Sequence, residues 1–415
     1  MASLNLQRNS EVYVSTVSLA AGANPNTMTP SNTWKVEVLA GFAMSSSAAT
    51  QDITAMESGT NPDRSQTRFL TSVNPVEWNF QTYLRPTGAS ELGGALNALN
   101  TTHTGNSKPV ADWFLWQYLV SNTAPTTGTT EQSTWRASGL LASNTLAAVS
   151  NAAATKSNFA TANEFQLYFK LDNVIYQVNN AAVNQATVDA GIEEIATVTW
   201  AGNGLTITEL TNSNYSNATA VFKAANANAR NATAAYSYHP FKEMNVGTGS
   251  GSAVSTNSFI KNRLSAIEFN YTDASSTTKT FTFPVTALSF DYTNNITYLS
   301  PEELNTLNSP IGQFTGTRAV SGTATMYLKQ GTAESNAFFS VIANDSRTST
   351  SLNTTANLII GGATAPYVSF YMPAVQFDFP QMATEDVIAM SVNFVAQETA
   401  ADKGNGGEVT IRAKK

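Results

Sequence analysis

Sequence patterns occur twice in this chain, in the same order, and this duplication limits its fold more than any other feature. RNSEVYVSTV near the start places Asn9 ahead of Val12 and Val14, and KNRLSAIEFNY past the middle places Asn262 ahead of Ile267. A pattern that recurs in this way indicates that one structural unit is used twice, and such repeats define the architecture of the whole chain.

Four more pairs of segments follow in the same order. Their matching positions are Ile53 with Ile296, Tyr83-Leu84 with Tyr327-Leu328, Val174 with Val375, and Trp200 with Phe394. A short aromatic segment follows each Tyr-Leu position, so we expect one helix over 112–120 and another over 336–342. Five pairs in one order favour a duplication over chance similarity between short strand patterns.

The spacing of these pairs predicts the domain boundaries. We expect a first β domain over 1–210, a linker over 211–257 and a second β domain over 258–415. Matching positions lie 244 residues apart at Leu84 but 201 apart at Val174, so the first copy carries a long loop insertion at about 85–160. Gly, Ser, Thr and Asn dominate that insertion, and the linker is rich in Asn and Ala, with a short helix expected near 220–234.

Apolar and polar residues alternate within the matched segments, which is the pattern of half-buried antiparallel strands. Val76, Trp78 and Phe80 share one face, and polar residues stand between them. We therefore expect a mainly β fold whose apolar faces build the core and whose polar faces carry almost no Lys or Arg. Such a polar face is either an ordinary solvent-exposed surface or the lining of a pore.

Composition excludes several classes of function. Charged residues make up 12% of the chain, about half the usual share. A net charge of −7 argues against a protein that wraps nucleic acid, which needs a basic surface. Without Cys and with two His, the chain offers no disulfide, thiolate site or multi-histidine metal site. It shows no signal peptide pattern and no apolar run of about 18 residues that would span a membrane.

Two features look like chemical motifs but fail their requirements. The adjacent acids Glu193-Glu194 and Glu385-Asp386 occupy matching positions, yet neighbours on a strand point to opposite faces, so we expect turn residues. The aromatic cluster at 113–118 has no interleaved basic residues, so we expect it to pack in the core rather than to stack on bases. We expect no catalytic, cofactor-binding or metal-binding residues and no enzyme activity.

The chain resembles a known family over nearly its whole length. The matching stretches are LNLQRNSEVYVSTV (4–17), NPVEWNFQTYLRP (74–86), VNQATVDAGIEEIATVTWAGNG (183–204), SFIKNRLSAI (258–267), NNITYLSP (294–301), SPIGQFTGTRAVSGTATMYL (309–328) and TEDVIAMSVNFVA (384–396). Together they resemble the major tail tube protein of long-tailed siphophages, in the duplicated form that builds trimeric, pseudo-hexameric rings. The resemblance implies two tandem tail-tube β-sandwich domains, each with a short flanking helix and long loops.

The same resemblance implies a structural virion protein that polymerises as stacked rings into the conduit for DNA passage into the host. Its partners would be other copies of itself, the tape measure protein, the tail terminator and tip proteins, and phage DNA in transient, non-specific contact. No membrane partner is implied. The protein would be made in the host cytoplasm and would end in the tail of the virion.

Candidate site residues follow from the polar faces and from the loops that the resemblance places between rings. The candidate lumen-facing residues are Glu77, Asn79, Gln81, Gln177, Thr197, Thr199, Gln376, Asp378, Ser391 and Asn393. The stacking loops are expected near 43–72 and 290–312, with the candidate residues Asp52, Glu57, Asp63, Arg64, Glu302 and Glu303. A neutral or acidic wall would let DNA slide, because each basic contact to a phosphate adds affinity.

Three other readings stay open at this stage. One is a different self-assembling shell, such as a capsid decoration or a surface-layer protein. Another is a carbohydrate-binding β module of an adhesin, which needs clustered exposed aromatic side chains. A third is a hydrolase, which needs a pair of carboxylates that converge in a cleft.

Overall fold

A computed structural model of the chain describes residues 10–16, 33–39, 41–53, 67–85, 112–120, 126–127, 133–136, 164–171, 174–210, 242–243, 260–272, 278–300, 310–331, 334–345, 354–362, 367–383, 387–398 and 408–414. The fold is mainly β, as predicted. Within these ranges the α-helices are α1 (Trp113–Val120) and α4 (Ser335–Asp345), which confirm the two helices expected from the aromatic segments.

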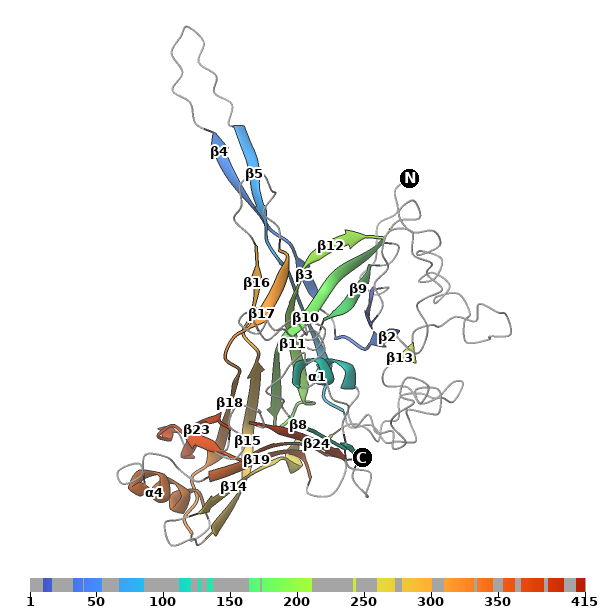
Figure 1. The fold of residues 1–415 in the computed structure, drawn as a ribbon. Helices are drawn as coiled ribbons and strands as arrows, with labels where there is room; N and C mark the ends of the chain where they lie inside the picture. Colours follow the sequence, from blue (N-terminus) through green and yellow to red (C-terminus); the bar gives the residue numbers. More distant parts are fainter. Residues whose placement is uncertain are drawn as a thin grey trace, which may run out of the picture.

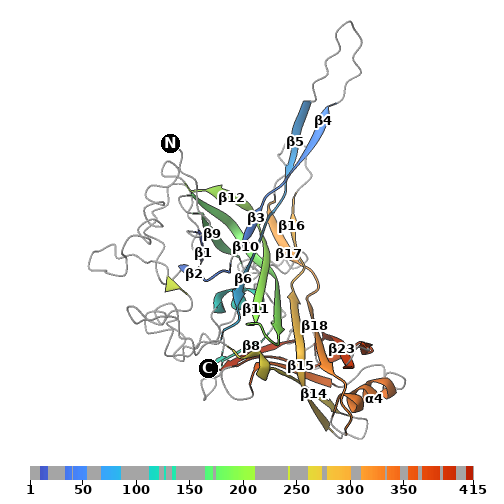
Figure 2. The same ribbon diagram turned by 180° about the vertical axis from the view of Figure 1, so that it is seen from behind.

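One antiparallel sheet takes strands from both halves of the chain, and we call it the shared sheet. In spatial order it contains β3 (Ala43–Ser45), β6 (Val76–Tyr83), β11 (Thr197–Gly204), β10 (Val174–Gly191), β15 (Thr278–Thr293), β18 (Ala319–Tyr327) and β23 (Ala389–Ala396). On its far side β23 pairs with β21 (Val375–Phe377) and β22 (Gln381–Ala383). The pairing of β10 with β15 joins the two halves, and in Figure 2 β10 and β11 of the first half lie beside β15 and β18 of the second.

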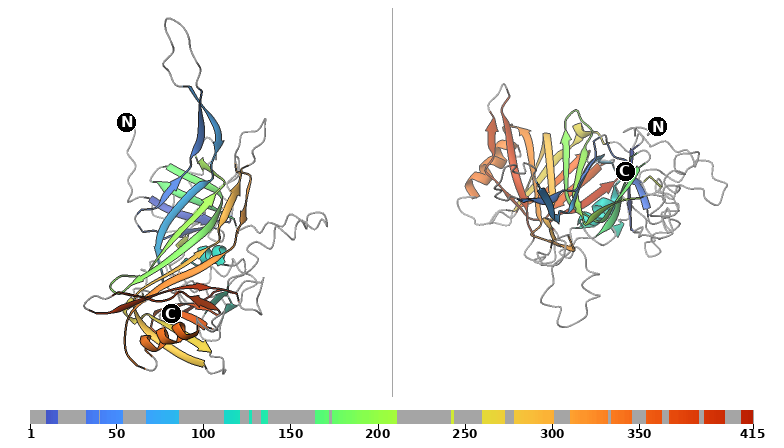
Figure 3. Two further views of the ribbon diagram at one scale, coloured as in Figure 1. Left: turned by 90° about the vertical axis from the view of Figure 1, so that its left-hand side faces the viewer. Right: turned by 90° about the horizontal axis from the view of Figure 1, so that it is seen from above.

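Each half also has an outer sheet. The first outer sheet has the order β2 (Thr33–Val36), β1 (Ser10–Ser15), β9 (Phe165–Leu171), the first part of β10, and β12 (Thr206–Glu209). The second has the order of the first part of β15, then β14 (Ala266–Thr272), β19 (Thr354–Gly361), β20 (Tyr367–Met372) and β24 (Thr410–Lys414). The long strands β10 and β15 pass from an outer sheet into the shared sheet. Figure 3 gives two further views of the sheets.

The two halves repeat the same pattern of strand pairing. The outer orders β2-β1-β9-β10-β12 and β15-β14-β19-β20-β24 correspond, and so do β3-β6-β11-β10 and β15-β18-β23-β22 within the shared sheet. Equivalent hydrogen bonds fix the alignment. The N–H of Leu84 donates to the carbonyl of Ala196, and the N–H of Leu328 donates to that of Ile388, each at 2.9 Å.

Two of the sequence matches are wrong in this alignment. Val174 pairs with Leu171 in the first outer sheet, whereas Val375 pairs with Ala396 in the shared sheet. Trp200 lies four residues after Ala196, and the residue four after Ile388 is Val392 rather than Phe394. The sequence hides this second error because a shift of two residues leaves every side chain on the same face.

Short strands from the predicted insertion and from the predicted linker are added to the edges of the outer sheets. β8 (Ser133–Arg136) pairs with β7 (Thr126–Thr127) and with β24, so a segment of the first half extends the outer sheet of the second. β13 (Lys242–Glu243) runs parallel to β2. The sequence predicted loops at these strands, and the helix expected near 220–234 lies outside the described residues.

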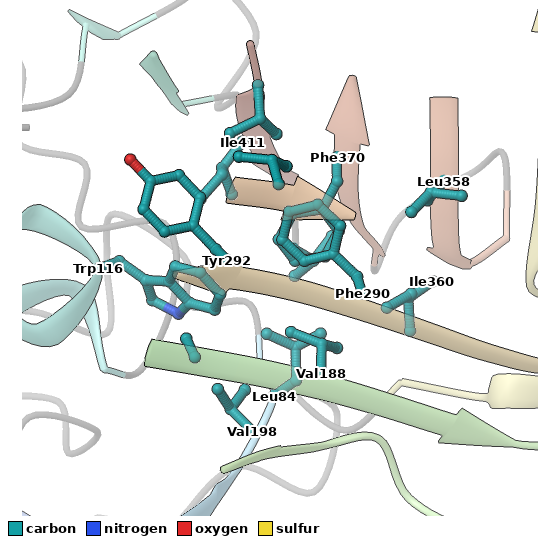
Figure 4. Close-up of a cluster of buried hydrophobic side chains, with 14 of the residues drawn as sticks. Leu84, Trp116, Val188, Val198, Phe290, Tyr292, Leu358, Ile360, Phe370 and Ile411 are labelled. Carbon is teal, nitrogen blue, oxygen red and sulfur yellow. The ribbon is translucent and has the colours of Figure 1, made fainter. Parts of the chain in front are cut away.

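A single hydrophobic core runs through both halves. The ring of Trp116 in α1 lies 4.9 Å from that of Trp200 in β11 and 5.8 Å from that of Phe370 in β20. Phe114 and Trp116 are buried, which confirms that the aromatic cluster packs in the core. Figure 4 shows Trp116 beside side chains from both halves, including Phe290 and Tyr292. The junction between the halves is therefore part of the core. Each large side chain that is buried there contributes about 1.5–3 kcal/mol.

Two hairpins extend beyond the shared sheet. The first arm, β4 (Ala48–Ile53) with β5 (Thr67–Val73), lies between β3 and β6 in the chain. The second arm, β16 (Ile296–Leu299) with β17 (Gly312–Thr315), lies between β15 and β18 in the equivalent place. In Figure 1 the first arm projects from the top of the molecule, while the second lies closer to β10.

Candidate functional site: the polar face of the shared sheet

The face of the shared sheet that turns away from the core is polar. In β6 the apolar residues Val76, Trp78 and Phe80 are buried, and the residues between them are exposed. The same alternation continues through β11, β18 and β23. Nine of the ten candidate residues lie on this face: Glu77, Asn79, Gln81, Thr197, Thr199, Gln376, Asp378, Ser391 and Asn393.

Side chains of the polar face bond to one another across the strands. Gln81 Nε2 donates to Thr199 Oγ1 at 2.9 Å in the first half. Thr323 Oγ1 donates to Asn393 Oδ1, also at 2.9 Å, in the second half. Cross-strand pairs of this kind stabilise a sheet by about 0.2–1 kcal/mol each.

Asp291 ties the two halves together at the centre of this face. It lies in β15, directly opposite Thr187 of β10. Its Oδ1 accepts hydrogen bonds from Thr187 Oγ1 at 2.6 Å and from Gln185 Nε2 at 2.7 Å, and its Oδ2 accepts one from Thr293 Oγ1 at 2.9 Å. Charge-assisted bonds are about twice as strong as neutral ones, so this carboxylate fixes the register of β10 against β15.

The polar face is acidic and carries no cation in the strands that the structure describes. Glu77, Asp189, Asp291 and Asp378 are its charged residues, and the segments of β3, β6, β10, β11, β15, β18, β21, β22 and β23 within the shared sheet contain no Lys or Arg. Such a surface offers no binding site for phosphate groups and repels them weakly.

Two cations of the first outer sheet, and Arg85 after β6, are paired with acids. Lys35 and the buried Lys170 both donate to Glu11, with Nζ–O distances of 2.9 and 2.6 Å. Burial disfavours the charge on Glu11, but the hydrogen bonds from Lys170 and Lys35 outweigh it and lower the pKa of this carboxyl to about 2. Arg85 pairs in the same way with Glu37.

Gln177 is the exception among the ten candidates, and its placement on the polar face is wrong. The side chain is 1% exposed, and its Nε2 donates to Gln166 Oε1 at 3.2 Å and to Asn179 Oδ1 at 2.6 Å. It lies in the first part of β10, which pairs with β9 and β12 in the first outer sheet. The strand pattern predicted a separate strand on the polar face there, and nothing in it indicated that β10 spans two sheets.

Comparison with known proteins shows what kind of protein carries this surface. No protein-family model matches the chain. The chain is 27% identical over 421 aligned residues to the tail tube protein pb6 of Escherichia phage T5, and the alignment covers 99% of this chain and 76% of that protein. This chain is a siphophage tail tube protein. It is therefore a structural component of the virion tail, and the shell-protein and adhesin readings are not favoured.

The second arm of the tail tube protein is held by the first half. The hydroxyl of Tyr298 lies 3.0 Å from the carbonyl oxygen of Asn180 and 3.1 Å from that of Asn203. Gln313 Nε2 donates to Glu164 Oε1 at 3.1 Å. Burial, and then the charge of Glu164, raises the pKa of Tyr298 well above its usual range, so the hydroxyl keeps the proton that it donates.

In the first arm of the tail tube protein, β4 and residues 68–70 of β5 are exposed. All six residues of β4 are exposed, and Ile53 and Phe69 leave 52% and 48% of their surfaces uncovered. Asp52, a candidate stacking residue, forms an ion pair with Arg68, with 2.6 Å between Oδ1 and Nε. The other candidate stacking residues, Glu57, Asp63, Arg64, Glu302 and Glu303, lie outside the described residues.

A buried acid lies beneath the shared sheet, directly before α1. Thr82 Oγ1 donates to Asp112 Oδ2 at 2.5 Å, and Trp200 Nε1 donates to Thr82 Oγ1 at 3.0 Å. Burial raises the pKa of Asp112 to about 7, although the bond from Thr82 and the charge of Arg85 oppose the shift. Sequence patterns did not predict this buried acid. An aspartate just before an apolar helix is the signal that could have found it.

The paired acids Glu193 and Glu194 lie in the exposed turn between β10 and β11, as predicted. Glu193 forms an ion pair with Arg263 at 2.9 Å, and both side chains are mostly solvent-exposed. Glu385 and Asp386 lie outside the described residues. Within the described ranges, no three His, Cys, Asp or Glu residues form a metal site, and no helix is long and apolar enough to cross a membrane.

Proposed function

We propose that this tail tube protein polymerises as stacked rings into the tail tube, the conduit through which phage DNA passes into the host. The polar face of the shared sheet carries the proposal, because it is continuous across both halves and free of cations in the described strands. The relation to the phage T5 tail tube protein over 99% of the chain supports it. This role is structural and requires no catalytic group or cofactor.

Each ring would contain three chains and, because each chain holds two tandem tail-tube domains, six similar units around one axis. The repeated pairing pattern of the two halves supports this arrangement, since equivalent units can occupy equivalent places. A shared core and the pairing of β8 with β24 join the two units of one chain.

The polar face would line the lumen. The nine residues that lie on it would then face the DNA, together with Asp189 and Asp291. Every basic contact to a phosphate releases counterions and adds affinity, so a lumen without cations lets DNA slide. The four acids repel the DNA weakly and keep it away from the wall.

The arms would carry the contacts between rings. The exposed first arm has the length and the uncovered apolar side chains that such a contact needs. At the ends of the tube, the tape measure protein and the terminator and tip proteins would be the partners. Those partners are proposed from the resemblance to tail tube proteins and from no contact in this chain.

Electron microscopy of the purified full-length protein tests the proposal. We expect tubes of stacked rings whose cross-section has threefold or pseudo-sixfold symmetry. A protein that stays monomeric under all assembly conditions, or that forms flat layers, would contradict it.

The charge of the lumen has a separate test. We expect the triple variant Asn79→Lys, Thr199→Lys and Asn393→Lys to assemble into tubes that deliver DNA more slowly. The matched control places three lysines at Thr278, Thr280 and Thr282, which are exposed on the second outer sheet. Equal rates of DNA delivery in the two sets of tubes would show that the polar face does not line the path of the DNA.

A further inference from the structure

The junction between the two halves shows how one unit of this fold joins the next. β10 of the first half pairs with β15 of the second over seven residue pairs, from Gln185 with Thr293 to Gly191 with Ala287. On the core side of the junction Val188 lies opposite Phe290, and they are 1% and 0% exposed. On the polar side Thr187 bonds to Asp291.

Among the described residues, the same two kinds of edge remain unpaired at the ends of the shared sheet. In the described part of the chain β3 pairs only with β6, and β22 pairs only with β23. Ala43 pairs with Asn79, five residues before Leu84, and Ser289 pairs with Thr323, five residues before Leu328. β3 is therefore the first-half counterpart of the joining segment of β15.

β22 is the counterpart of β10 by the same reasoning. Asp189 pairs with Thr197, the residue after Ala196, and Ala383 pairs with Ala389, the residue after Ile388. Each chain thus ends in one edge of the β10 kind and one of the β15 kind. Two edges that match in this head-to-tail sense form a heterologous contact, which gives a ring when the rotation between neighbouring chains closes.

We propose that β22 of one chain pairs antiparallel with β3 of a second copy, in the register that the internal junction sets. In that register Gln381 lies opposite Ser45, Met382 opposite Met44, and Ala383 opposite Ala43. These pairs repeat Thr187 with Asp291, Val188 with Phe290, and Asp189 with Ser289. The inference rests on the proposed function, because it describes how the rings of the tube close.

The side chains of the two edges fit each other in this register. Met382 and Met44 both lie on the core side, where they pair with Met390 and Trp78. Met382 is 44% exposed in the single chain, whereas its counterpart Val188 is buried, so the contact covers an apolar side chain that is otherwise in water. Gln381 and Ser45 are both exposed on the polar side, as amide and hydroxyl partners.

Neither edge is protected against pairing by charge. Natural edge strands commonly carry Lys, Glu or an inward-pointing charge that blocks association, but β3 reads AMS and β22 reads QMA. The apolar residues Phe379, Val387 and Ile388 beside β22 are also exposed, by 58%, 59% and 42%. Both strands are only three residues long. In the free subunit they therefore offer only a short edge to other chains, and their pairing becomes stable when a ring closes.

Disulfide trapping tests the register, since the chain contains no Cys. Residues directly opposite each other have Cα atoms about 4.5–5.5 Å apart, within the range of a disulfide, whereas diagonal residues lie about 7–8 Å apart. In oxidised tubes we expect Ser45→Cys with Gln381→Cys, and Ala43→Cys with Ala383→Cys, to link chains into a covalent ring. The off-register pair Ala43→Cys with Gln381→Cys is the matched control and should link at least tenfold less.

Hydrogen exchange of the unmodified protein gives a second readout that does not depend on variants. Amides of 43–45 and 381–383 should exchange quickly in the free subunit and become protected in tubes. Tubes that link best through the off-register pair, or whose 381–383 amides stay unprotected, would overturn the inference and leave the tube function intact. A wild-type protein that forms no tubes at all would instead contradict the proposed function.

Discussion

The two arms are equivalent hairpins with different environments. The second arm is bound to the first half through Tyr298, whose hydroxyl reaches two backbone carbonyls, and through Gln313. The first arm is exposed along β4 and leaves Ile53 and Phe69 uncovered. One hairpin is thus bound within the chain, whereas the described residues of the other are largely exposed, which agrees with the proposed stacking of rings.

The two halves also differ at one ladder position in the shared sheet. Trp78 of β6 pairs with Gly202 of β11, and at the equivalent place Gly322 of β18 pairs with Phe394 of β23. A Cβ added to Gly202 would lie 2.3 Å from the ring of Trp78, and one added to Gly322 would lie 2.3 Å from the ring of Phe394. Each half therefore fills this position with one large ring over a glycine, on opposite strands.

The largest expected effect comes from adding a side chain to the glycine at that position, where a large ring already lies. Gly202→Ala places a methyl group 2.1 Å from the carbonyl oxygen of Ala182 as well as against Trp78, so the backbone must shift. We expect a loss of about 3 kcal/mol in the free energy of unfolding, and a similar loss for Gly322→Ala. Urea denaturation measures both. Gly312→Ala is the matched control, because nothing lies within 4 Å of its added Cβ. Equal stability of all three variants would refute this account of the two halves.

The residues that precede the two helices should make the stability of the two halves depend differently on pH. Asp112, directly before α1, is 3% exposed, whereas Glu334, directly before α4, is only half-buried. Because the pKa of Asp112 is raised to about 7 in the folded protein, the folded state holds a proton that the unfolded state has released above pH about 4. Its contribution to stability is therefore full at low pH and is lost as the pH rises through about 7.

The expected slope is at most about 1.4 kcal/mol per pH unit between these two pKa values. Urea denaturation of the wild type and of Asp112→Asn from pH 5 to 8 measures it. As the pH rises, the free energy of unfolding of the wild type should fall relative to that of the variant. A difference that stays constant with pH would show that Asp112 keeps an ordinary pKa.

A smaller effect is expected when the second arm is released. Tyr298→Phe removes the hydroxyl that binds the carbonyls of Asn180 and Asn203, at a cost of about 1–2 kcal/mol. Hydrogen exchange at 296–299 should then rise toward the rate at 48–53 in the first arm. Tyr327→Phe, at a side chain that is 46% exposed, is the control and should change neither exchange nor stability. Unchanged exchange in Tyr298→Phe would mean that the hydroxyl does not hold the arm.

The smallest effect on the free subunit is expected in the first arm. Arg68→Ala removes the ion pair with Asp52, whose side chains are 56% and 39% exposed, so stability should change by less than about 0.5 kcal/mol. Calorimetry of the subunit measures this. If the arm contacts other rings, the same variant should shorten tubes seen by electron microscopy. Tubes of normal length would show that this ion pair takes no part in the proposed stacking contact.

Local patterns predicted much of this fold because their physical cause is local. The alternation around Trp78 fixed both the strand β6 and its polar face, and the apolar run after Asp112 fixed α1. The Tyr83-Leu84 match found equivalent strand ends, since both segments finish the same ladder.

Pairing over long distances was not predictable in the same way. Gln177 was misplaced because nothing in its neighbourhood shows that β10 bends from one sheet into another. β8 could not be assigned because its partner, β24, lies at the other end of the chain. The hydrogen bonds of Asp291, which set the junction, involve Gln185 and Thr187, more than a hundred residues away.

The central claim is that the polar face of the shared sheet lines a closed tube. A reconstruction of assembled tubes by electron cryo-microscopy, at a resolution that shows side chains, tests it most directly. The account predicts that Glu77, Asn79, Asp291 and Asn393 point into the lumen and that β22 continues into β3 of the next chain. Tubes in which this face points outward, or in which another sheet lines the lumen, would contradict it.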